Sequence, residues 1–261
     1  MDLVATLSLM NLRTLRAALA RRFLIKLKRA THRSPPTLAV PQARRVLVGA
    51  PHMDDEVIPC GGTLLLLAES GAEVHVVFAS DSSAGLKDPA LAAQLQSVRR
   101  AEATRVCEYM KFSSSTELGF PDSDLARHET ALASALKREI ERVKPEIIFC
   151  PFPADAHSDH MSCAWATGSA VRQASWQGSI YSYELWTPLW PNSVVDISRF
   201  AERKAAAIRI YASQLADRDY TAAALGLNRY RGLVVAVDYA EAFYVAGPES
   251  FAGLTAMLDE I

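Results

Sequence analysis

Acidic side chains are almost absent from the first fifty residues of this 261-residue chain. Asp2 is the only acidic residue before Asp54, whereas ten of the 28 basic residues precede Val46. Residues 46–261 therefore hold 18 basic and 28 acidic side chains, although the formal charge of the whole chain is −1. This pattern indicates a basic N-terminal arm attached to an acidic domain, for which we expect no nucleic-acid partner.

The sequence also lacks paired cysteines and long apolar runs. Its four cysteines are scattered without a CxxC spacing, which predicts free thiols in a reducing compartment. No apolar run reaches the roughly 18–20 residues of a membrane-spanning helix. The apolar residues 3–10 precede the basic ones, which is the reverse of a secretory signal. We therefore expect a cytoplasmic protein.

Residues 8–30 have the pattern of a basic amphipathic helix. Apolar side chains recur there at three- and four-residue intervals, at Leu12, Leu15, Leu19, Phe23 and Leu27. Such a helix fits peripheral contact with the inner face of an anionic membrane. It equally fits docking on the acidic domain, packing in a homo-oligomer, or disorder. Ser34-Pro35-Pro36-Thr37 then breaks the helix, so we expect an extension at 1–38 and one large domain at 39–261.

From residue 43 onward, strand-like and helix-like segments alternate. The apolar patterns predict strands at 44–50, 73–80, 115–119, 146–151, 179–186 and 233–245. They predict helices at 61–67, 89–111, 125–143, 161–174 and 199–213. Repeated strand–helix units indicate an α/β fold, a Rossmann-like three-layer sandwich with a mostly parallel sheet.

Two runs rich in histidine and aspartate come shortly after predicted strands. His52-Met53-Asp54-Asp55-Glu56 follows the strand at 44–50, and His157-Ser158-Asp159-His160 follows the strand at 146–151. In an open parallel sheet the carboxyl ends of the strands share one edge, where ligands bind. The two runs therefore predict a metal site at that edge.

Three side chains are the expected ligands. His52 and Asp55 are three residues apart at a strand-to-helix turn, which lets both converge on one ion, and His160 supplies the third ligand. Two imidazoles and one carboxylate with an open position fit a catalytic Zn²⁺. Because a similar set binds Fe²⁺, the ligand types leave another divalent ion open.

The neighbouring residues suit hydrolysis. Asp54 is adjacent to a ligand and free to act as a general base, although either Asp54 or Asp55 alone is also a common helix cap. His157 is placed to stabilise the oxyanion of a tetrahedral intermediate. Asp159 is expected to orient His157 or keep it protonated.

These motifs resemble the LmbE-like family of zinc-dependent N-deacetylases. That family includes N-acetylglucosaminyl-phosphatidylinositol de-N-acetylases and the deacetylases of mycothiol and bacillithiol synthesis. Its His-Pro-Asp-Asp-Glu motif is similar to residues 52–56, and its His-Pro-Asp-His motif is similar to residues 157–160. The following Gly61-Gly62-Thr63-Leu64 also resembles the family's helix start, and the resemblance covers roughly residues 44–245.

The resemblance implies the same roles for the residues above and adds two substrate contacts. Arg99, in Arg99-Arg100-Ala101-Glu102, matches an Arg-x-x-Glu stretch whose arginine binds substrate. Asp122, in Phe120-Pro121-Asp122-Ser123, is similar to an acid that contacts sugar hydroxyls. An exposed helix charge at Arg99 and a turn or cap at Asp122 are the ordinary alternatives.

Some positions depart from the family pattern. Met53 and Ser158 replace the prolines of the two motifs, which we expect to loosen the backbone locally. Asp155 stands where some members have a tyrosine, so a tyrosine contribution to the oxyanion is in doubt. In the second half, Trp186, Trp190 and Arg231 are candidates for an aromatic sugar-binding wall or for ordinary core positions.

The reaction that the resemblance implies is hydrolysis of the N-acetyl amide of an amino sugar. The substrate would be a GlcNAc-type unit of a glycoconjugate, glycolipid or polysaccharide precursor, with acetate as one product. Two alternatives stay open: an amidase that removes a larger acyl group from a glycoconjugate or antibiotic, and a non-catalytic sugar-binding or membrane-docked assembly subunit. The presence of both Asp54 and His157 argues against the non-catalytic alternative.

Overall fold

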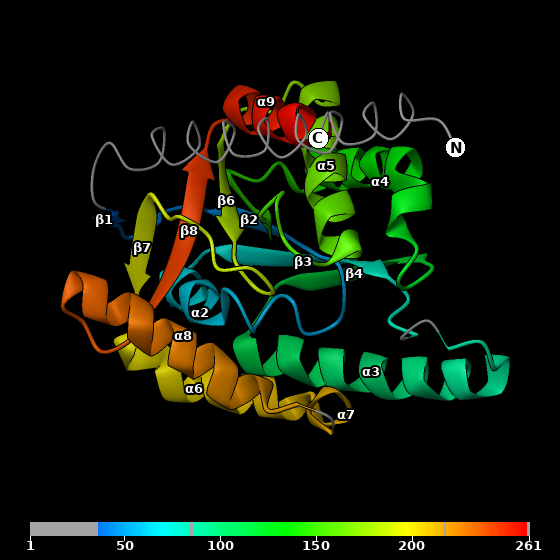
Figure 1. Cartoon of the computed structure of the whole chain (residues 1–261), viewed down its shortest axis with the longest axis horizontal. Coiled ribbons are helices and arrows are strands. Elements are labelled where there is room, and N and C mark those ends of the chain that lie inside the picture. Colours follow the sequence, from blue (N-terminus) through cyan, green and yellow to red (C-terminus); the bar gives the residue numbers. More distant parts are fainter. Residues whose placement is uncertain (1–35, 84–85, 217, 260–261) are drawn as a thin grey trace, which may run out of the picture.

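A single sheet of eight strands runs through the part of the chain that the computed structural model describes, which is residues 36–83, 86–216 and 218–259. The strand order is β1-β7-β8-β6-β5-β2-β3-β4 (Figure 1). The strands are β1 (Thr37–Leu38), β2 (Arg45–Ala50), β3 (Glu73–Ser80), β4 (Ser114–Phe120), β5 (Ile147–Pro151), β6 (Ser179–Tyr183), β7 (Ser193–Asp196) and β8 (Ala240–Ala246). Only β8 runs antiparallel to its neighbours, β6 and β7.

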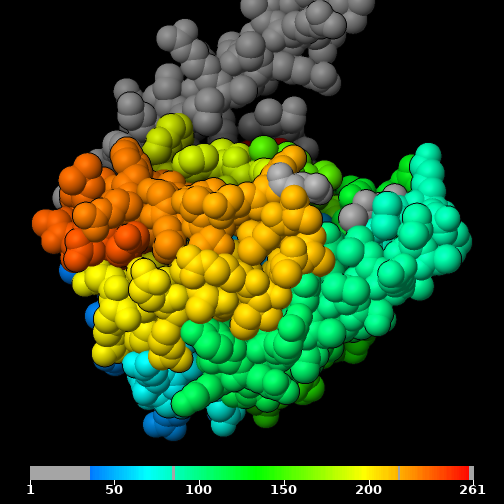
Figure 2. Space-filling model, turned by 90° about the horizontal axis from the view of Figure 1, so that it is seen from below, coloured from blue at the N-terminus to red at the C-terminus, as the bar shows by residue number. Residues whose placement is uncertain are grey.

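Helices cover both faces of this sheet, as Figure 1 shows. One layer contains α4 (Glu129–Val143), α5 (Ser158–Gln173) and α9 (Pro248–Asp259). The other contains α2 (Gly61–Glu69), α3 (Pro89–Met110), α6 (Ala201–Ile210), the short α7 (Ala212–Leu215) and α8 (Tyr220–Val235). Figure 2 looks onto this second layer, where α8 (orange), α6 (yellow) and α3 (green) lie side by side. The predicted three-layer α/β fold with a mostly parallel sheet is confirmed.

The strands are apolar on both faces because helices cover both. Val46 and Val48 of β2 belong to the core beneath α2, α3 and α6, whereas Leu47 between them belongs to the core beneath α4 and α5. Alternate residues of β3 divide between the same two cores. The continuous apolar runs that predicted these strands therefore serve two separate hydrophobic cores.

The topological switch point of the sheet lies between β2 and β5. From β2 it adds β3 and β4 on one side, then returns to add β5 and β6 on the other side. In open α/β sheets the crevice at the carboxyl ends of such a strand pair is the usual ligand site. Because β2 ends at Ala50 and β5 ends at Pro151, both histidine-containing motifs start at this crevice.

The second half of the chain differs most from the prediction. Residues 233–235 close α8 rather than open a strand, so β8 begins only at Ala240. Asp219 caps the start of α8 through its side chain, and Ala236 ends it with a positive φ of 60°. These end signals outweigh the valines near its C-terminus, which favour a strand. Strand β7 and helices α8 and α9 were not predicted, and the helix expected at 199–213 is divided into α6 and α7.

Smaller differences concern where elements begin. Helix α5 starts at Ser158, three residues before the predicted start at Met161, and residues 125–128 form a 3₁₀ turn ahead of α4. Strand β1 pairs with β7 immediately before the expected domain start at residue 39. The amphipathic helix predicted for residues 8–30 lies outside the described residues and stays a prediction. Among the described residues, every helix is too short or too polar to cross a lipid bilayer.

A buried ion pair joins the second half of the chain to the helix after the first motif. Lys204 of α6 and Glu241 of β8 are both inaccessible to solvent, and the Lys204 Nζ lies 2.7 Å from Glu241 Oε1. The same carboxylate accepts the main-chain N–H groups of Gly62 and Thr63 at 2.8 and 2.7 Å. Asn228 of α8 accepts a further hydrogen bond from Lys204 at 2.8 Å. Glu241 therefore satisfies N–H groups in the first turn of α2 that would otherwise lack partners.

Replacing Lys204 with methionine is expected to lower the free energy of unfolding by about 3–5 kcal/mol, because it leaves the buried Glu241 carboxylate without its counter-charge. Urea denaturation of the purified variant measures the loss. Lys137→Met is the matched control, since Lys137 makes a partly exposed helical pair with Glu141 at 3.2 Å, and such pairs contribute about 0.3–0.5 kcal/mol. Equal losses in the two variants would contradict a stabilising role for the buried pair.

Candidate metal centre and the adjoining cleft

The first motif forms a tight turn with an unusual backbone at Asp54. Its φ of 137° lies in a region that residues other than glycine seldom adopt. The Asp54 carbonyl accepts the N–H groups of Val57 and Ile58 at 3.0 and 3.1 Å. Strained positions of this kind persist only where the surroundings hold them, and they are concentrated at functional sites.

Hydrogen bonds on both sides hold this turn in place. The N–H of Met53 donates to Ser82 Oγ at 3.1 Å, and the carbonyl of Met53 accepts from the side chain of Gln214 at 3.0 Å. The N–H of Asp54 donates to Glu56 Oε2 at 3.0 Å, and Glu56 in turn accepts from the hydroxyl of Tyr211. The loss of the motif proline at Met53 is therefore offset by hydrogen bonds, one of which uses an N–H that proline lacks.

The second motif begins α5. The ring of His157 caps this helix, because its Nδ1 accepts the main-chain N–H of Asp159 at 3.2 Å. The N–H of His157 is itself held by Asp155 Oδ1 at 3.0 Å. A neutral imidazole that accepts through Nδ1 carries its proton on Nε2. His157 is thus set up as a hydrogen-bond donor through Nε2.

The three expected ligands converge. Asp55 Oδ2 lies 3.1 Å from His52 Nδ1 and 3.3 Å from His160 Nε2, and these three atoms form a group that is able to hold a metal ion. The ring of His160 is fully buried, and among the described residues neither of its nitrogens has a hydrogen-bond partner. Buried polar atoms without partners are costly, and two nitrogens with one carboxylate oxygen match a divalent transition metal. The residues therefore fit a metal ion.

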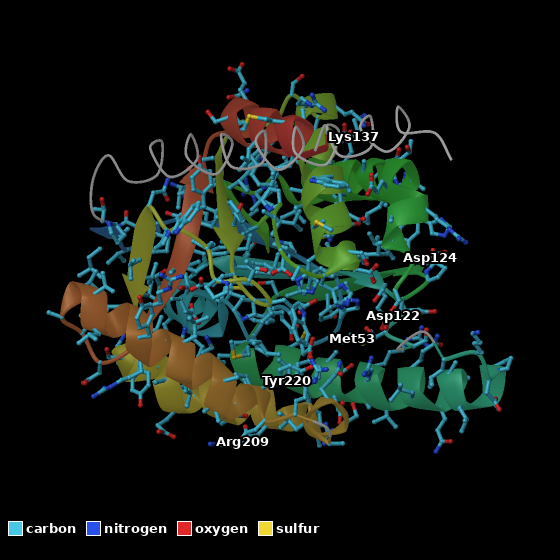
Figure 3. All side chains as sticks on the ribbon, viewed as in Figure 1. Met53, Asp122, Asp124, Lys137, Arg209 and Tyr220 are labelled. Carbon is cyan, nitrogen blue, oxygen red and sulfur yellow. The ribbon has the colours of Figure 1, made fainter. Side chains whose placement is uncertain are left out.

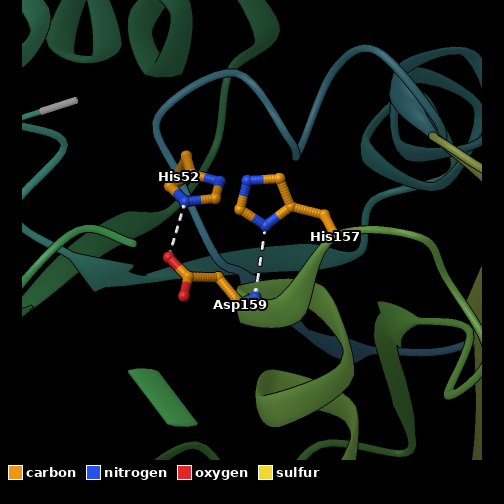
Figure 4. A group of neighbouring side chains, drawn as sticks. All are labelled: His52, His157 and Asp159. Carbon is orange, nitrogen blue, oxygen red and sulfur yellow. Dashed lines mark hydrogen bonds and ion pairs between the residues drawn. The ribbon is translucent and has the colours of Figure 1, made fainter. Parts of the chain in front are cut away.

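A second group shares His52 with the first. His52, His157 and Asp159 also bring ligand atoms within 4.8 Å of one another (Figure 4). The Asp159 carboxylate, however, already accepts the N–H groups of Ser123 and Leu125 at 2.8 and 3.1 Å. Its Oδ2 lies 3.0 Å from His52 Nε2. This arrangement is typical of an outer partner that orients a ligating histidine.

The position of Asp159 corrects its expected role. We predicted that its carboxylate would orient His157, but the carboxylate faces His52 and two main-chain N–H groups instead. The contact with the His157 ring comes from the main-chain N–H of Asp159 (Figure 4). The sequence did not reveal this because residues 123–125, which draw the carboxylate away, belong to a distant segment.

The adjacent carboxylates Asp54 and Asp55 have pKa values displaced in opposite directions. Burial, reinforced by the negative charge of Asp55, raises the pKa of Asp54 well above its usual range. Burial alone would also raise the pKa of Asp55, but the electrostatic influence of the nearby His160 and His52 rings, together with the hydrogen bond from His52, lowers it below its usual range. Asp55 is therefore held as an anion, whereas Asp54 has an increased affinity for a proton.

Both predicted substrate-binding residues lie at this site. Arg99 is buried in α3 rather than exposed, and it donates to the carbonyl of Ser82 at 2.8 Å and to Gln214 at 2.6 Å. Asp122 lies 3.9 Å from Arg99 and 3.4 Å from His52 Nε2 (Asp122 and Met53 are labelled in Figure 3).

A cleft of about 570 Å³ opens beside the metal-binding group. Its lining includes Arg99, His157, Trp186, Gln214, Arg218 and Tyr220. The ring of His157 packs against those of His52 and His160, with centroids 5.1 and 5.0 Å apart. His157 thus belongs both to the imidazole cluster and to the wall of the cleft.

Several cleft residues were not predicted to have a role. Gln214 was not among the predicted site residues, and its contacts depend on α7 packing against the first motif. The proposed sugar wall needs correction, because Arg231 is buried and makes two hydrogen bonds to the carboxylate of Glu184. Trp186 does line the cleft, with the guanidinium of Arg218 5.1 Å above its ring.

Comparison with known proteins gives consistent matches. The family model described as PIG-L, GlcNAc-PI de-N-acetylase, matches residues 47–173. The diacetylchitobiose deacetylase of Thermococcus kodakarensis is 27% identical over 191 residues, which is 67% of this chain and 71% of that protein. The 1D-myo-inositol 2-acetamido-2-deoxy-alpha-D-glucopyranoside deacetylase of Mycobacteroides abscessus is 25% identical over 236 residues, covering 67% and 83%.

A solved structure agrees over nearly the whole chain. The N,N'-diacetylchitobiose deacetylase of Pyrococcus horikoshii, in complex with an inhibitor, superposes with a TM-score of 0.70 and 25% identity. The superposition covers 93% of this chain and 97% of the other. The similarity therefore extends beyond the matched motifs to the second half, which forms one wall of the cleft.

Zn²⁺ binding by single variants shows which of the two groups that share His52 holds the ion. We expect Asp55→Ala and His160→Ala to weaken Zn²⁺ binding by more than the roughly 10–100-fold that loss of an outer partner costs. His157→Ala should keep a single tight ion, because His157 lies outside the favoured group. Calorimetric titration of metal-stripped protein measures each affinity, with circular dichroism as the folding control. The opposite pattern would place the ion between His157 and Asp159.

Proposed function

Because the chain belongs to the PIG-L, or LmbE-like, family, we propose that it hydrolyses the N-acetyl amide of an N-acetylglucosamine-type amino sugar and releases acetate. The observation that carries this proposal is the position of His157. His157 belongs to a cluster of three imidazoles, next to two carboxylates with shifted pKa values, and it also lines a cleft large enough for a sugar. The relatives are named as deacetylases of diacetylchitobiose and of an inositol 2-acetamido-2-deoxyglucopyranoside.

A divalent metal is part of the proposal, with zinc as the favoured ion and Fe²⁺ as the alternative. His52, Asp55 and His160 would hold it, and Asp159 would orient His52. When bound, such an ion supplies Lewis acidity, which polarises a carbonyl oxygen and makes a water molecule more acidic. The two neutral nitrogens and one anionic oxygen leave an open position, as catalytic sites require.

Asp54 is the proposed general base. Its raised pKa gives the carboxylate an affinity for the proton of an attacking water. The same carboxyl then returns that proton to the nitrogen of the leaving amine, so that water and amide yield acetate and a free amine. The hydrogen bonds around Met53 and Glu56 keep Asp54 in position for both transfers.

His157 is the proposed oxyanion donor. Its Nδ1 accepts from a main-chain N–H, which leaves the proton on Nε2 for the carbonyl oxygen as negative charge builds there. Burial, reinforced by the electrostatic influence of the neighbouring His52 and His160, lowers the pKa of His157. A neutral donor therefore suffices, and the Asp159 carboxylate is not needed beside it.

Arg99 and Asp122 are the proposed contacts for the sugar. Arg99 lines the cleft, and its guanidinium is fixed by Ser82 and Gln214. Asp122 lies between Arg99 and His52, next to the reacting groups. A carboxylate and a guanidinium together provide acceptors and donors for sugar hydroxyls.

The base role predicts a separation of metal binding from turnover. Asp54→Asn should keep bound Zn²⁺ but lower kcat by about 10²–10⁴-fold, because it removes the proton acceptor. Acetate release from diacetylchitobiose and related N-acetyl sugars is measured with and without a chelator. Asp124→Asn is the matched control, since Asp124 carries a partly exposed carboxylate that pairs with Arg127 at 3.4 Å (Figure 3).

Two results would count against this proposal. Metal-dependent acetate release that persists in full in Asp54→Asn would remove the base role. Absence of release from every N-acetyl sugar, with Zn²⁺ restored, would instead favour an amidase for larger acyl groups or a non-catalytic subunit.

The donor role predicts that glutamine replaces His157 better than alanine does. His157→Ala should lower kcat by about 10²–10³-fold, as removal of one oxyanion donor does. His157→Gln keeps an N–H group near the same place and should recover part of that loss, with little change in KM. The measurement is steady-state acetate release by both variants at saturating Zn²⁺. Equal activity of the two variants would show that the N–H of residue 157 is not used.

A further inference from the structure

An apolar pocket of about 180 Å³ lies beside the proposed substrate cleft. Hydrocarbon side chains from four segments line it: Ile58, Pro59, Leu185, Ala223, Ala224, Leu227 and Ala242. Ile58 and Pro59 directly follow the first motif, and the lining residues at 223–227 belong to α8. The pocket therefore lies between the chemical site and the outer helix layer seen in Figure 2.

The polar side chains in this pocket are already paired with protein groups. The Glu184 carboxylate accepts two hydrogen bonds from Arg231 and one from the N–H of Leu189. The side-chain oxygen of Asn228 accepts from Lys204. Because the Glu184 carboxylate and the Asn228 side-chain oxygen already have protein partners, the surface offered by the pocket is chiefly hydrocarbon.

Two aromatic rings connect the pocket to the cleft. Trp186 and Tyr220 line both spaces, and their rings meet edge to face with centroids 6.2 Å apart. On the cleft side the ring of Trp186 lies nearly parallel to that of His157, with centroids 6.3 Å apart. Trp186 thus lies beside His157 on the cleft side and borders the apolar pocket on the other.

We propose that this pocket is a subsite for an apolar group carried by the substrate. The inference rests on the proposed function, because it assumes that the sugar occupies the cleft beside His157. An apolar cavity of about 150 Å³ accommodates benzene, so this pocket suits a ring or a chain of about six carbons. Two positions on an amino sugar can carry such a group: the glycosidic oxygen and the acyl carbon of the amide.

The first experiment uses ligands without an amide, so that binding is independent of turnover. The methyl and hexyl glycosides of glucosamine are titrated calorimetrically into the zinc-loaded full-length protein. Each methylene that enters the pocket should tighten binding by about fourfold, and we expect the hexyl glycoside to bind at least tenfold more tightly overall. Equal affinities, or no detectable binding of the hexyl glycoside, would argue against a subsite for a glycosidic group.

Blocking the pocket tests whether it is the source of any preference. Ala223→Phe places a ring at an exposed position of α8 that lines the pocket, and it should reduce the hexyl-to-methyl affinity ratio to within about twofold of unity. Ala222→Phe is the matched control, because Ala222 is an exposed neighbour on α8 outside the pocket lining. A ratio that survives in Ala223→Phe would locate the preference elsewhere and overturn the proposal.

The second experiment distinguishes the two carriers of the apolar group. Methyl glycosides of N-acetyl- and N-hexanoylglucosamine are compared by kcat/KM in the wild type and in Ala223→Phe. A pocket-dependent preference for hexanoyl assigns the subsite to the acyl chain, whereas a preference confined to the hexyl glycoside assigns it to the aglycone. If neither experiment shows a preference for the hexyl or the hexanoyl compound, the proposed subsite is wrong. Failure to release acetate bears only on the proposed function, since glycoside binding is measured without turnover.

Discussion

The chemical site depends on a small set of hydrogen bonds that hold the turn at residues 53–56, where Asp54 adopts a backbone conformation that it would otherwise avoid. Asp54 has a φ of 137°, and such conformations cost roughly 1–3 kcal/mol. Ser82 and Gln214 each bind one polar group of the Met53 backbone, and Glu56 binds the N–H of Asp54. The turn is therefore shaped by the loop that follows β3, by α7 and by the side chain of Glu56, and these contacts leave it little conformational freedom.

Those hydrogen bonds in turn require that α7 be placed accurately. The carboxylate of Glu102 on α3 accepts both the N–H and the hydroxyl of Ser213, and Arg99, one turn earlier on the same helix, holds Gln214. On the far side of the turn, Glu241 holds the start of α2. Gly62 lets Ile197, the residue after β7, approach, because a Cβ there would lie 2.7 Å from side-chain carbons of Ile197. Elements from the second half of the chain thus fix both ends of a motif that belongs to the first half.

This dependence explains which features the sequence could predict. Strands β2, β3 and β5 are recognisable because burial on both faces makes them continuous apolar runs. The convergence of His52, Asp55 and His160 follows from a rule about parallel sheets, so it needed no detailed packing. The roles of Gln214 and Asp159 were out of reach, since each depends on contacts between segments far apart in sequence. Helix α8 was not predicted. Its terminal valines have strand propensity, but its capping residues and tertiary contacts make the segment helical.

The arrangement also separates the chemistry from the choice of substrate. The proposed metal ligands and Asp54 come from the carboxyl ends of β2 and β5, where the topology of the sheet leaves little room for variation. Trp186, Arg218 and Tyr220, by contrast, follow β6 and lie in connections and at the start of α8. Changes in those segments alter the cleft and the apolar pocket without moving a ligand. Trp186 is the point of contact between the two parts, because it stacks beside His157 on one side and borders the apolar pocket on the other. In the proposed function, the group attached to the sugar would therefore be selected next to the bond that is cleaved, by residues that take no part in cleaving it.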